Sequence, residues 1–162
     1  PRNDGSSVGV EIILDGRVCP RNRWASNCPL IAERYIAGRE LTVSVLNGNA
    51  LCVTEIITNT QFYDYSAKYD VGGSRHILPA AIPDSCNQKA MSWSERAFEL
   101  LGCRGIARAD FRWDEDNDSL YLLELNTQPG MTKTSLVPEQ ASFCNLEMHR
   151  LITTLVEAAQ CD

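Results

Sequence analysis

The sequence contains, at residues 106–126, the stretch IARADFRWDEDNDSLYLLELN, in which two strand-like segments flank an acidic turn. In the first segment, Ile106–Trp113, apolar and polar side chains alternate, as they do in a half-buried β-strand. The turn at residues 114–118 leads into a second segment, Ser119–Asn126. Two such segments around a short polar turn predict an antiparallel β-hairpin.

The second segment ends with an acid and an amide two positions apart, Glu124 and Asn126. Residues i and i+2 of a strand point to the same face of a sheet, so the oxygens of these two side chains are expected to lie side by side. Arg108 and Asp110 share one face of the first segment for the same reason. If the two faces coincide, one surface carries two carboxylates, an amide oxygen and a guanidinium.

That combination favours a site for a metal ion and a phosphate. Hard cations such as Mg²⁺ bind carboxylate and amide oxygens together with waters and substrate phosphates, and an arginine neutralises charge that develops on a transferred phosphoryl group. Residues 127–135 show no apolar periodicity and are expected to form a polar loop beside this site. The alternative interpretation is a cross-strand ion pair between Arg108 and Glu124, which would contribute under about 1 kcal/mol if exposed.

Apolar runs bounded by turn signals predict four further strands, at residues 8–14, 30–36, 39–46 and 51–57. The pair Asn47–Gly48 predicts a tight hairpin between the last two. Residues 58–83 have little apolar periodicity but several aromatic side chains, which makes disorder unfavourable, and we interpret them as a lid.

Two amphipathic helices are also expected. The first begins at Asp84 or Ser85 and ends at Leu101, before Gly102. Its inward-facing residues are expected to be Ala90, Trp93, Ala97, Leu100 and Leu101. The second helix covers residues 145–160, with Leu151, Ile152, Leu155 and Ala159 on one face. Together these elements predict an α+β fold built on a largely antiparallel sheet.

Composition limits the function classes. The 162 residues fit one domain. Acidic residues outnumber basic ones by 21 to 15, and no cluster of Lys and Arg is interleaved with aromatics, so a nucleic-acid partner is not expected. No apolar run approaches the roughly 18 residues of a membrane span. The first residue is Pro and no signal-peptide pattern follows it, so we expect the sequence to begin inside a longer protein.

The 7 cysteines are widely and irregularly spaced, which argues against a disulfide framework or a zinc site. Most have apolar neighbours and are expected to pack as small hydrophobic residues, with Cys161 the one expected to be exposed. A reducing cytoplasm is the compartment that suits such thiols.

Blocks of the sequence resemble, in the same order, the C-terminal ATP-grasp region of bacterial D-alanine–D-alanine ligases. These blocks are GSSVGV at residues 5–10, ERYIAGREL at 33–41, FYDYSAKY at 62–69, LGCRGIARADF at 101–111 and ELNTQPGMTKTSLVP at 124–138. Residues 17–27 depart from the family pattern, being shorter than expected. The resemblance implies that residues 1–162 form the ATP- and Mg-binding catalytic domain with a lid loop, without the N-terminal substrate domain and part of the central domain.

The resemblance implies a two-step ligation that supplies a peptidoglycan precursor in the bacterial cytoplasm. ATP phosphorylates the carboxylate of one D-alanine, and the amine of a second D-alanine attacks the acylphosphate and releases phosphate. It also implies two Mg²⁺ or Mn²⁺ ions, held by Asp110, Glu124 and Asn126. Arg108 and the amide of Gly130 are implied to stabilise the acylphosphate and the tetrahedral intermediate. A homodimer is expected from family analogy.

Further residue roles follow from the same resemblance. Lys68 is expected to reach the ATP phosphates as a long point charge, and Tyr69 with Ser6 is expected to close the lid. The remaining roles concern recognition: Glu33 and Glu40 for the adenine amino group and the ribose hydroxyls, Tyr35 and Ile36 for the adenine slot, and Ser135 and Leu136 for the carboxylate of the second substrate.

Two alternatives stay open. A D-alanine–D-lactate ligase typically carries a different, histidine-containing lid loop, whereas Ala67, Lys68 and Tyr69 are intact here. A non-catalytic ATP-binding module would be expected to lose a metal ligand or the lid lysine, and the sequence retains these residues. Residues 1–162 alone are not expected to turn over substrate.

Overall fold

The structure, a computed structural model, describes residues 2, 7–13, 24, 27–58 and 74–160. It divides into two compact units. The first comprises residues 1–35 and 58–75, and the second comprises residues 36–57 and 76–162. The second unit contains the predicted hairpin of residues 106–126 and most of the secondary structure described below.

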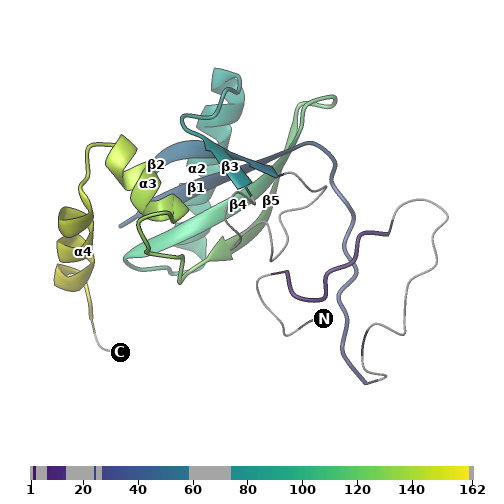
Figure 1. Ribbon diagram of the computed structural model, residues 1–162, viewed down its shortest axis with the longest axis horizontal. Coiled ribbons are helices and arrows are strands. Elements are labelled where there is room, and N and C mark those ends of the chain that lie inside the picture. Colours follow the sequence, from purple (N-terminus) through teal and green to yellow (C-terminus); the bar gives the residue numbers. More distant parts are fainter. Residues whose placement is uncertain (1, 3–6, 14–23, 25–26, 59–73, 161–162) are drawn as a thin grey trace. The chain divides into compact units, whose positions relative to one another are not determined.

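In the described residues, five strands form one sheet with the order β3-β2-β1-β4-β5 (Figure 1). The strands are β1 Arg39–Leu46, β2 Asn49–Thr58, β3 Ser74–Ile77, β4 Ile106–Asp114 and β5 Ser119–Asn126. β1 is antiparallel to β2 and to β4, and β4 is antiparallel to β5. Both predicted hairpins are therefore confirmed. Asn47 and Gly48 adopt φ values of 48° and 84°, the left-handed turn that matches strand twist.

Helix α2 (Asp84–Leu100) covers one face of the sheet. Its residues Cys86 and Ala90 pack with Leu41 and Val43 of β1 and with alternate residues of β4, among them Phe111. Leu41 and Phe111 are both fully buried. Burying this apolar layer is the main source of the stability of the sheet.

The opposite face is covered at one end by α3 (Leu136–Phe143), against which α4 (Met148–Glu157) packs. Val137 and Ala141 of α3 form a buried cluster with Leu151 of α4. The arrangement of helices on a largely antiparallel sheet confirms the predicted α+β class. None of the described helices is long and apolar enough to cross a membrane.

Two predicted strands are wrong. Residues 8–13 and 30–36 have no strand structure, and Val8, Val10 and Ile31 are 50%, 49% and 57% exposed. An apolar run forms a stable strand only where a neighbouring strand and an apolar layer can receive it. Within the described part of their own unit, these runs bury little of their apolar surface. The predicted lid also contains β3, while its residues 59–73 lie outside the described part.

The inward face of α2 was predicted only in part. Ala90 and Ala97 are buried as expected, but Trp93 is 40% exposed and Leu100 and Leu101 are 67% and 68% exposed. The buried positions are Cys86, Ala90, Ser94, Ala97 and Phe98, which repeat at intervals of three or four residues. These positions fall on one helical face, and Trp93 and Leu100 lie at the edge of that face rather than at its centre.

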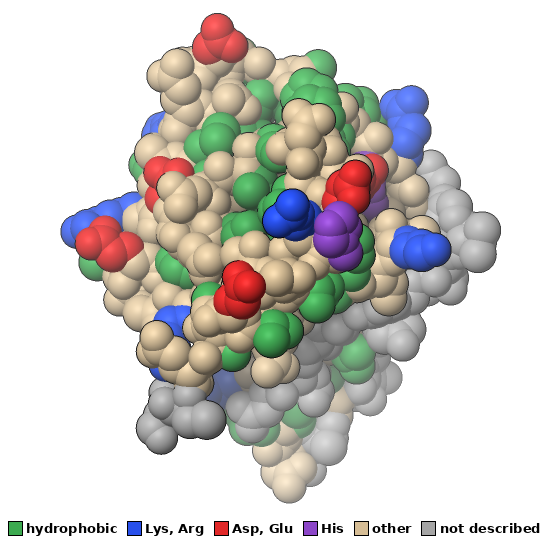
Figure 2. All heavy atoms as spheres, turned by 90° about the vertical axis from the view of Figure 1, so that its left-hand side faces the viewer, with side chains coloured by type: hydrophobic (Ala, Val, Ile, Leu, Met, Phe, Trp, Pro, Cys, Tyr) green, Lys and Arg blue, Asp and Glu red, His purple; other side chains and the backbone are tan. Residues whose placement is uncertain are grey.

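The C-terminal region contains two helices where one was predicted. α3 was missed because it is short and contains Pro138, which is tolerated at the third helical position because its missing N–H has no partner within the helix there. α4 begins at Met148, and Ile152 is 39% exposed rather than inward. Figure 2 looks onto this end of the molecule and shows hydrophobic side chains interspersed with polar ones at the surface.

Candidate active site

The four residues of the predicted site lie on one face of the β4–β5 pair. Arg108 is directly opposite Asn126, and Asp110 is directly opposite Glu124. Side chains of directly opposite residues in an antiparallel pair project to the same side of the sheet. The condition that the two strand faces coincide is therefore met, on the side of the sheet opposite to α2.

A β-bulge in β5 is what produces this arrangement. Phe111 pairs with Leu122, whereas the preceding Asp110 pairs with Glu124, so Leu123 is an extra residue on β5. In an uninterrupted strand, Leu120 and Glu124 would point to the same face. Because Leu120 belongs to the core cluster under α2, that face would bury the glutamate. The extra residue reverses the alternation, as bulges beside functional sites commonly do.

Asp110 is held by two neighbours. The Arg108 guanidinium donates from Nε to Oδ1 and from Nη2 to Oδ2, each at 2.8 Å. The Thr42 hydroxyl, from β1, donates to the same Oδ1 at 2.7 Å. Asp110 is only 8% exposed, and charge-assisted bonds of this kind compensate the burial of a carboxylate. Arg108 is thus paired with Asp110 on its own strand, whereas the alternative interpretation expects an ion pair with Glu124 on the neighbouring strand.

Arg112 continues the same face of β4 and contacts two of the predicted nucleotide residues. Its Nε donates to the carbonyl oxygen of Ile36 at 3.1 Å, and its Nη1 lies 3.4 Å from Oε2 of Glu40. Both side chains of the ion pair are nearly buried. Glu33 and Tyr35 belong to the other compact unit, where both side chains are exposed, so the predicted nucleotide residues are divided between the two units.

The loop between β5 and α3 brings Gly130 and Ser135 together. A Cβ on Gly130 would lie 2.8 Å from the Ser135 hydroxyl oxygen, so only glycine fits without displacing that group. The hydroxyl also accepts from the Thr132 amide at 3.1 Å and lies 2.8 Å from the Thr132 hydroxyl. Ser135 is the N-cap of α3 but makes no side-chain capping bond, which leaves first-turn amides, including that of Leu136, without a side-chain cap.

The oxygens of the predicted metal site are hard donors that suit Mg²⁺ or Mn²⁺ rather than a soft metal. Asp110 and Glu124 lie opposite each other, and Asn126 lies on the same face. The Asn126 Oδ1 atom accepts the Gln128 amide at 2.9 Å, which fixes the side-chain orientation. Among the described residues, no group of three or more His, Cys, Asp and Glu side chains gathers as a metal site.

The remaining predicted residues, Ser6, Lys68 and Tyr69, lie outside the described residues. Two residues that the geometry connects to the site, Arg112 and Thr42, are not among those predicted from the sequence. Arg112 had a visible signal, since it extends the alternation of Arg108 and Asp110. Thr42 had none, because its contact with Asp110 joins positions 68 residues apart in the chain.

The cysteines that the structure describes are free thiols. Cys52 and Cys86 are buried as predicted, but Cys144 is exposed. The expectation that only Cys161 is exposed is therefore wrong, since Cys144 is exposed. Cys161 lies outside the described residues.

Comparison with known proteins identifies relatives along the whole chain. A D-alanine–D-alanine ligase of Rhodospirillum rubrum is 50% identical over 165 residues, which cover 100% of this chain and 54% of that protein. A D-alanine–D-alanine ligase of Ruegeria sp. (strain TM1040) is 50% identical over 166 residues, with the same coverage of 100% and 54%. The chain thus spans about half the length of these curated relatives.

Two solved structures of the same kind of enzyme are also similar to this chain. A crystal structure of D-alanine–D-alanine ligase from Bacillus anthracis complexed with ATP matches 78% of this chain and 39% of its own, with a TM-score of 0.65 and 25% identity. A second structure of D-alanine–D-alanine ligase from that organism matches 78% of this chain and 41% of its own, with a TM-score of 0.66 and 30% identity. The predicted fold class, the C-terminal lobe of an ATP-grasp enzyme, is confirmed by these neighbours.

The family described as D-ala D-ala ligase C-terminus matches residues 1–157. The resemblance inferred from the sequence blocks is therefore confirmed, and this chain belongs to the D-alanine–D-alanine ligase C-terminal family.

Proposed function

We propose that the intact protein joins two D-alanine molecules into D-alanyl-D-alanine at the expense of ATP, through an acylphosphate, to supply a peptidoglycan precursor. The observation that carries the proposal is the set of four side chains that share one face of the β4–β5 pair: Arg108, Asp110, Glu124 and Asn126. Two acids, an amide and a guanidinium on one rigid surface suit phosphoryl transfer, which depends mainly on positioning and electrostatic stabilisation. Membership of the ligase family gives this chemistry its substrate.

Asp110, Glu124 and Asn126 are proposed to hold two Mg²⁺ or Mn²⁺ ions. When bound, such ions would neutralise the negative charge of the ATP phosphates. The protein contributes a fixed orientation of each ligand: Thr42 and Arg108 orient Asp110, and the Gln128 amide orients Asn126.

Arg108 is proposed to donate hydrogen bonds to the acylphosphate and to the tetrahedral intermediate that follows. Its planar guanidinium already makes a two-point contact with the Asp110 carboxylate, a geometry that a phosphate oxygen pair can also accept. The Gly130 amide is proposed to lie behind the intermediate. A side chain at this position would collide with the Ser135 hydroxyl.

ATP is proposed to bind through Glu33, Tyr35, Ile36, Glu40 and Lys68. The neighbour from Bacillus anthracis was solved with ATP, which supports ATP as the nucleotide here. Arg112 supports this assignment for two of these residues, because it fixes the Ile36 carbonyl and the Glu40 carboxylate to β4. Ser6 and Tyr69 are proposed to close the site.

The second D-alanine is proposed to bind by its carboxylate at Ser135 and Leu136. Amide groups at the start of a helix attract anions, and here no side chain caps the first turn of α3. The carboxylate would therefore supply acceptors for the amides that a capping side chain usually satisfies.

We also infer that residues 1–162 are the ATP-binding and catalytic domain, and that the first D-alanine site needs an N-terminal substrate domain and part of a central domain. The match to about half of each curated relative supports this division. A homodimer and a cytoplasmic location complete the proposal; the free thiols of the described cysteines suit that compartment.

The test is ADP formation by the full-length gene product with Mg²⁺-ATP and D-alanine, with and without D-lactate, and with mass analysis of the products. ADP formation that depends on D-alanine, together with a dipeptide, is the expected result. A depsipeptide would reassign the protein as a D-alanine–D-lactate ligase. ATP binding without turnover would make a non-catalytic ATP-binding module the better description.

A further inference from the structure

Gln140, on α3, is an amide side chain buried completely against the sheet. Its Oε1 accepts the Ser44 amide at 2.7 Å. Its Nε2 donates to the Thr42 carbonyl at 3.2 Å and to the Thr54 hydroxyl at 2.9 Å. Burying an amide costs free energy unless its hydrogen bonds are satisfied, and here both donors and the acceptor have partners.

These bonds form at a second β-bulge, between β1 and β2. Val43 pairs with Val53 and Val45 pairs with Ala50, so two residues of β2 stand opposite Ser44 alone. A bulge interrupts the ladder of backbone hydrogen bonds. The Gln140 amide bonds to β1 beside this bulge, since it accepts the Ser44 N–H and donates to the Thr42 C=O.

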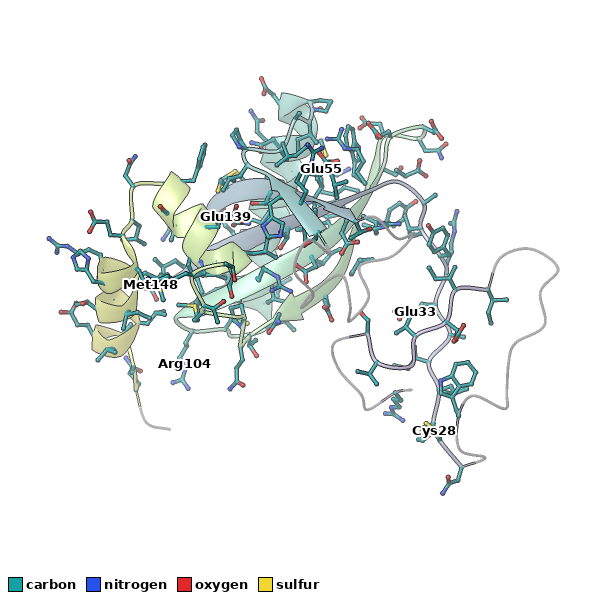
Figure 3. The ribbon with its side chains drawn as sticks, viewed as in Figure 1. Cys28, Glu33, Glu55, Arg104, Glu139 and Met148 are labelled. Atoms are coloured by element: carbon teal, nitrogen blue, oxygen red, sulfur yellow. The ribbon has the colours of Figure 1, made fainter. Side chains whose placement is uncertain are left out.

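The bulged residues of β2 also contact the end of α3. The Cys52 thiol lies 3.9 Å from the Gln140 carbonyl oxygen, and the Cys144 thiol lies 3.4 Å from the Leu51 carbonyl oxygen. Glu139, labelled in Figure 3, makes a further contact between α3 and the sheet. Its Oε2 lies 2.6 Å from Nδ1 of His76 on β3. The bulge is therefore one of the places where α3 contacts the sheet.

Thr42 connects this attachment to the candidate active site. Its carbonyl receives the Gln140 amide, and its hydroxyl donates to Oδ1 of Asp110 at 2.7 Å. Thr42 is fully buried. At the other end, α3 begins directly after Ser135. Thr42 and Gln140 thus connect the predicted metal ligand Asp110 with α3, at whose start the second substrate is predicted to bind.

We propose that Gln140 is a positioning residue, which acts through Thr42 to set the orientation of Asp110 and the position of the Ser135 end of α3. The proposal rests on the function proposed above. An isosteric apolar side chain would take from the buried Ser44 N–H the acceptor that Gln140 supplies, and would remove one donor to the Thr42 carbonyl. The strand would then be free to relax, and the Thr42 hydroxyl would move with it.

The experiment uses the full-length protein and four variants. Gln140→Met removes the amide at nearly constant volume, and Gln88→Met makes the same change at an exposed position on α2 as the matched control. Thr42→Val removes only the hydroxyl that holds Asp110, and Thr42→Ser keeps it. Binding of Mn²⁺ in the presence of a non-hydrolysable ATP analogue, followed by water-proton relaxation, is the readout that a purely structural role would leave unchanged.

We expect Gln140→Met and Thr42→Val each to weaken Mn²⁺ binding about 10-fold, the lower end of the effect of removing residues that orient metal ligands. Thr42→Ser and Gln88→Met should bind as the wild type does. Hydrogen exchange at the Ser44 amide should accelerate in Gln140→Met and remain slow in Thr42→Val. In turnover assays, Gln140→Met should also raise the KM for the second D-alanine.

Unchanged Mn²⁺ affinity in both Gln140→Met and Thr42→Val would overturn the proposal, even if thermal stability fell. If Gln140→Met fails to fold, the comparison of Thr42→Val with Thr42→Ser decides: equal affinity overturns the proposal, and loss in Val alone supports it. A wild-type protein that binds Mn²⁺ and the analogue but forms no dipeptide contradicts the proposed function, while the affinity comparison continues to test the positioning role.

Discussion

Arg108 and Asp110, two positions apart on β4, face each other through two parallel hydrogen bonds of 2.8 Å between guanidinium and carboxylate. The pair is nearly buried, with 13% and 12% of the two side chains exposed. A proposed phosphate-stabilising group and a proposed metal ligand therefore hold each other before any substrate is present. Changing either residue alters the environment of the other, so the two must be tested by variants that separate charge from shape.

Replacing Asp110 by Asn should abolish Mg²⁺-ATP turnover in the full-length protein and leave the fold intact. The amide has the same shape and retains one oxygen, but it lacks the charge that attracts a divalent cation. Glu124→Gln should have the same effect. ADP formation and circular dichroism measure the two properties, and a near-native rate in either variant would remove the metal assignment.

Arg108→Lys should lower kcat by about 10²–10³-fold, the cost typical of removing one preorganised donor from a transition state. Lysine keeps the positive charge but cannot make the planar two-point contact. Nucleotide affinity should change little, because the proposed contact is to the acylphosphate. Steady-state kinetics together with ATP titration check this, and a loss confined to ATP affinity would assign Arg108 to nucleotide binding instead.

Arg112→Met should weaken ATP binding, since the Ile36 carbonyl and the Glu40 carboxylate both lose a donor. Loss of this charged partner of the nearly buried Glu40 carboxylate should also lower the free energy of unfolding by about 1–3 kcal/mol. Arg96→Met is a suitable control, because Arg96 lies on the exposed side of α2 in an ion pair with Glu99. Calorimetric titration with ATP compares the two variants, and equal affinities would argue against a role for Arg112.

Gly130→Ala should raise the KM for the second D-alanine about 10-fold or more, because the added Cβ must displace the Ser135 hydroxyl from its position 2.8 Å away. Lys133→Ala, an exposed position in the same loop, should leave the KM unchanged. Initial rates at varied D-alanine concentration give the comparison. A native KM in Gly130→Ala would mean that the Ser135 hydroxyl is not required at its observed position.

Thiol alkylation should modify Cys144 well before Cys52. Cys144 is exposed, whereas burial, reinforced by the neighbouring Cys144, raises the pKa of the Cys52 thiol. A raised pKa lowers the thiolate fraction at any given pH, and the thiolate is the reactive form. Peptide mass mapping after iodoacetamide treatment at pH 8 should show Cys52 modified only after unfolding. Early modification of Cys52 in the native protein would show that α3 opens readily from β2.

Local patterns predicted much of the fold. The alternation of residues 106–113 and the Asn47–Gly48 turn each specify a hairpin through residues adjacent in sequence, and both hairpins are present. The runs at residues 8–13 and 30–36 show the same kind of pattern but form no strands. Whether such a run becomes a strand depends on a partner and an apolar layer, which local sequence does not specify.

Residue type predicted the four side chains of the site, but it did not predict the side chains that orient them. Asp110, Glu124, Asn126 and Arg108 stood out because acids, an amide and an arginine recur at intervals of two. Thr42 and Gln140 did not, because their hydrogen bond joins positions 98 residues apart and a buried threonine or glutamine has no distinctive local signature. Side chains that orient a site are recognisable only once the tertiary structure brings them together.

The extra residue Leu123 has a consequence for how this strand can vary among related proteins. Its side chain is 47% exposed, so many residue types fit there, yet its presence decides whether Glu124 faces the site or the core. Insertions and deletions in this part of β5 should therefore be tolerated less than substitutions of Leu123. A homologue with a substitution at this position should remain active, whereas one aligned with a single-residue gap between Leu120 and Glu124 should have lost or relocated its metal ligand.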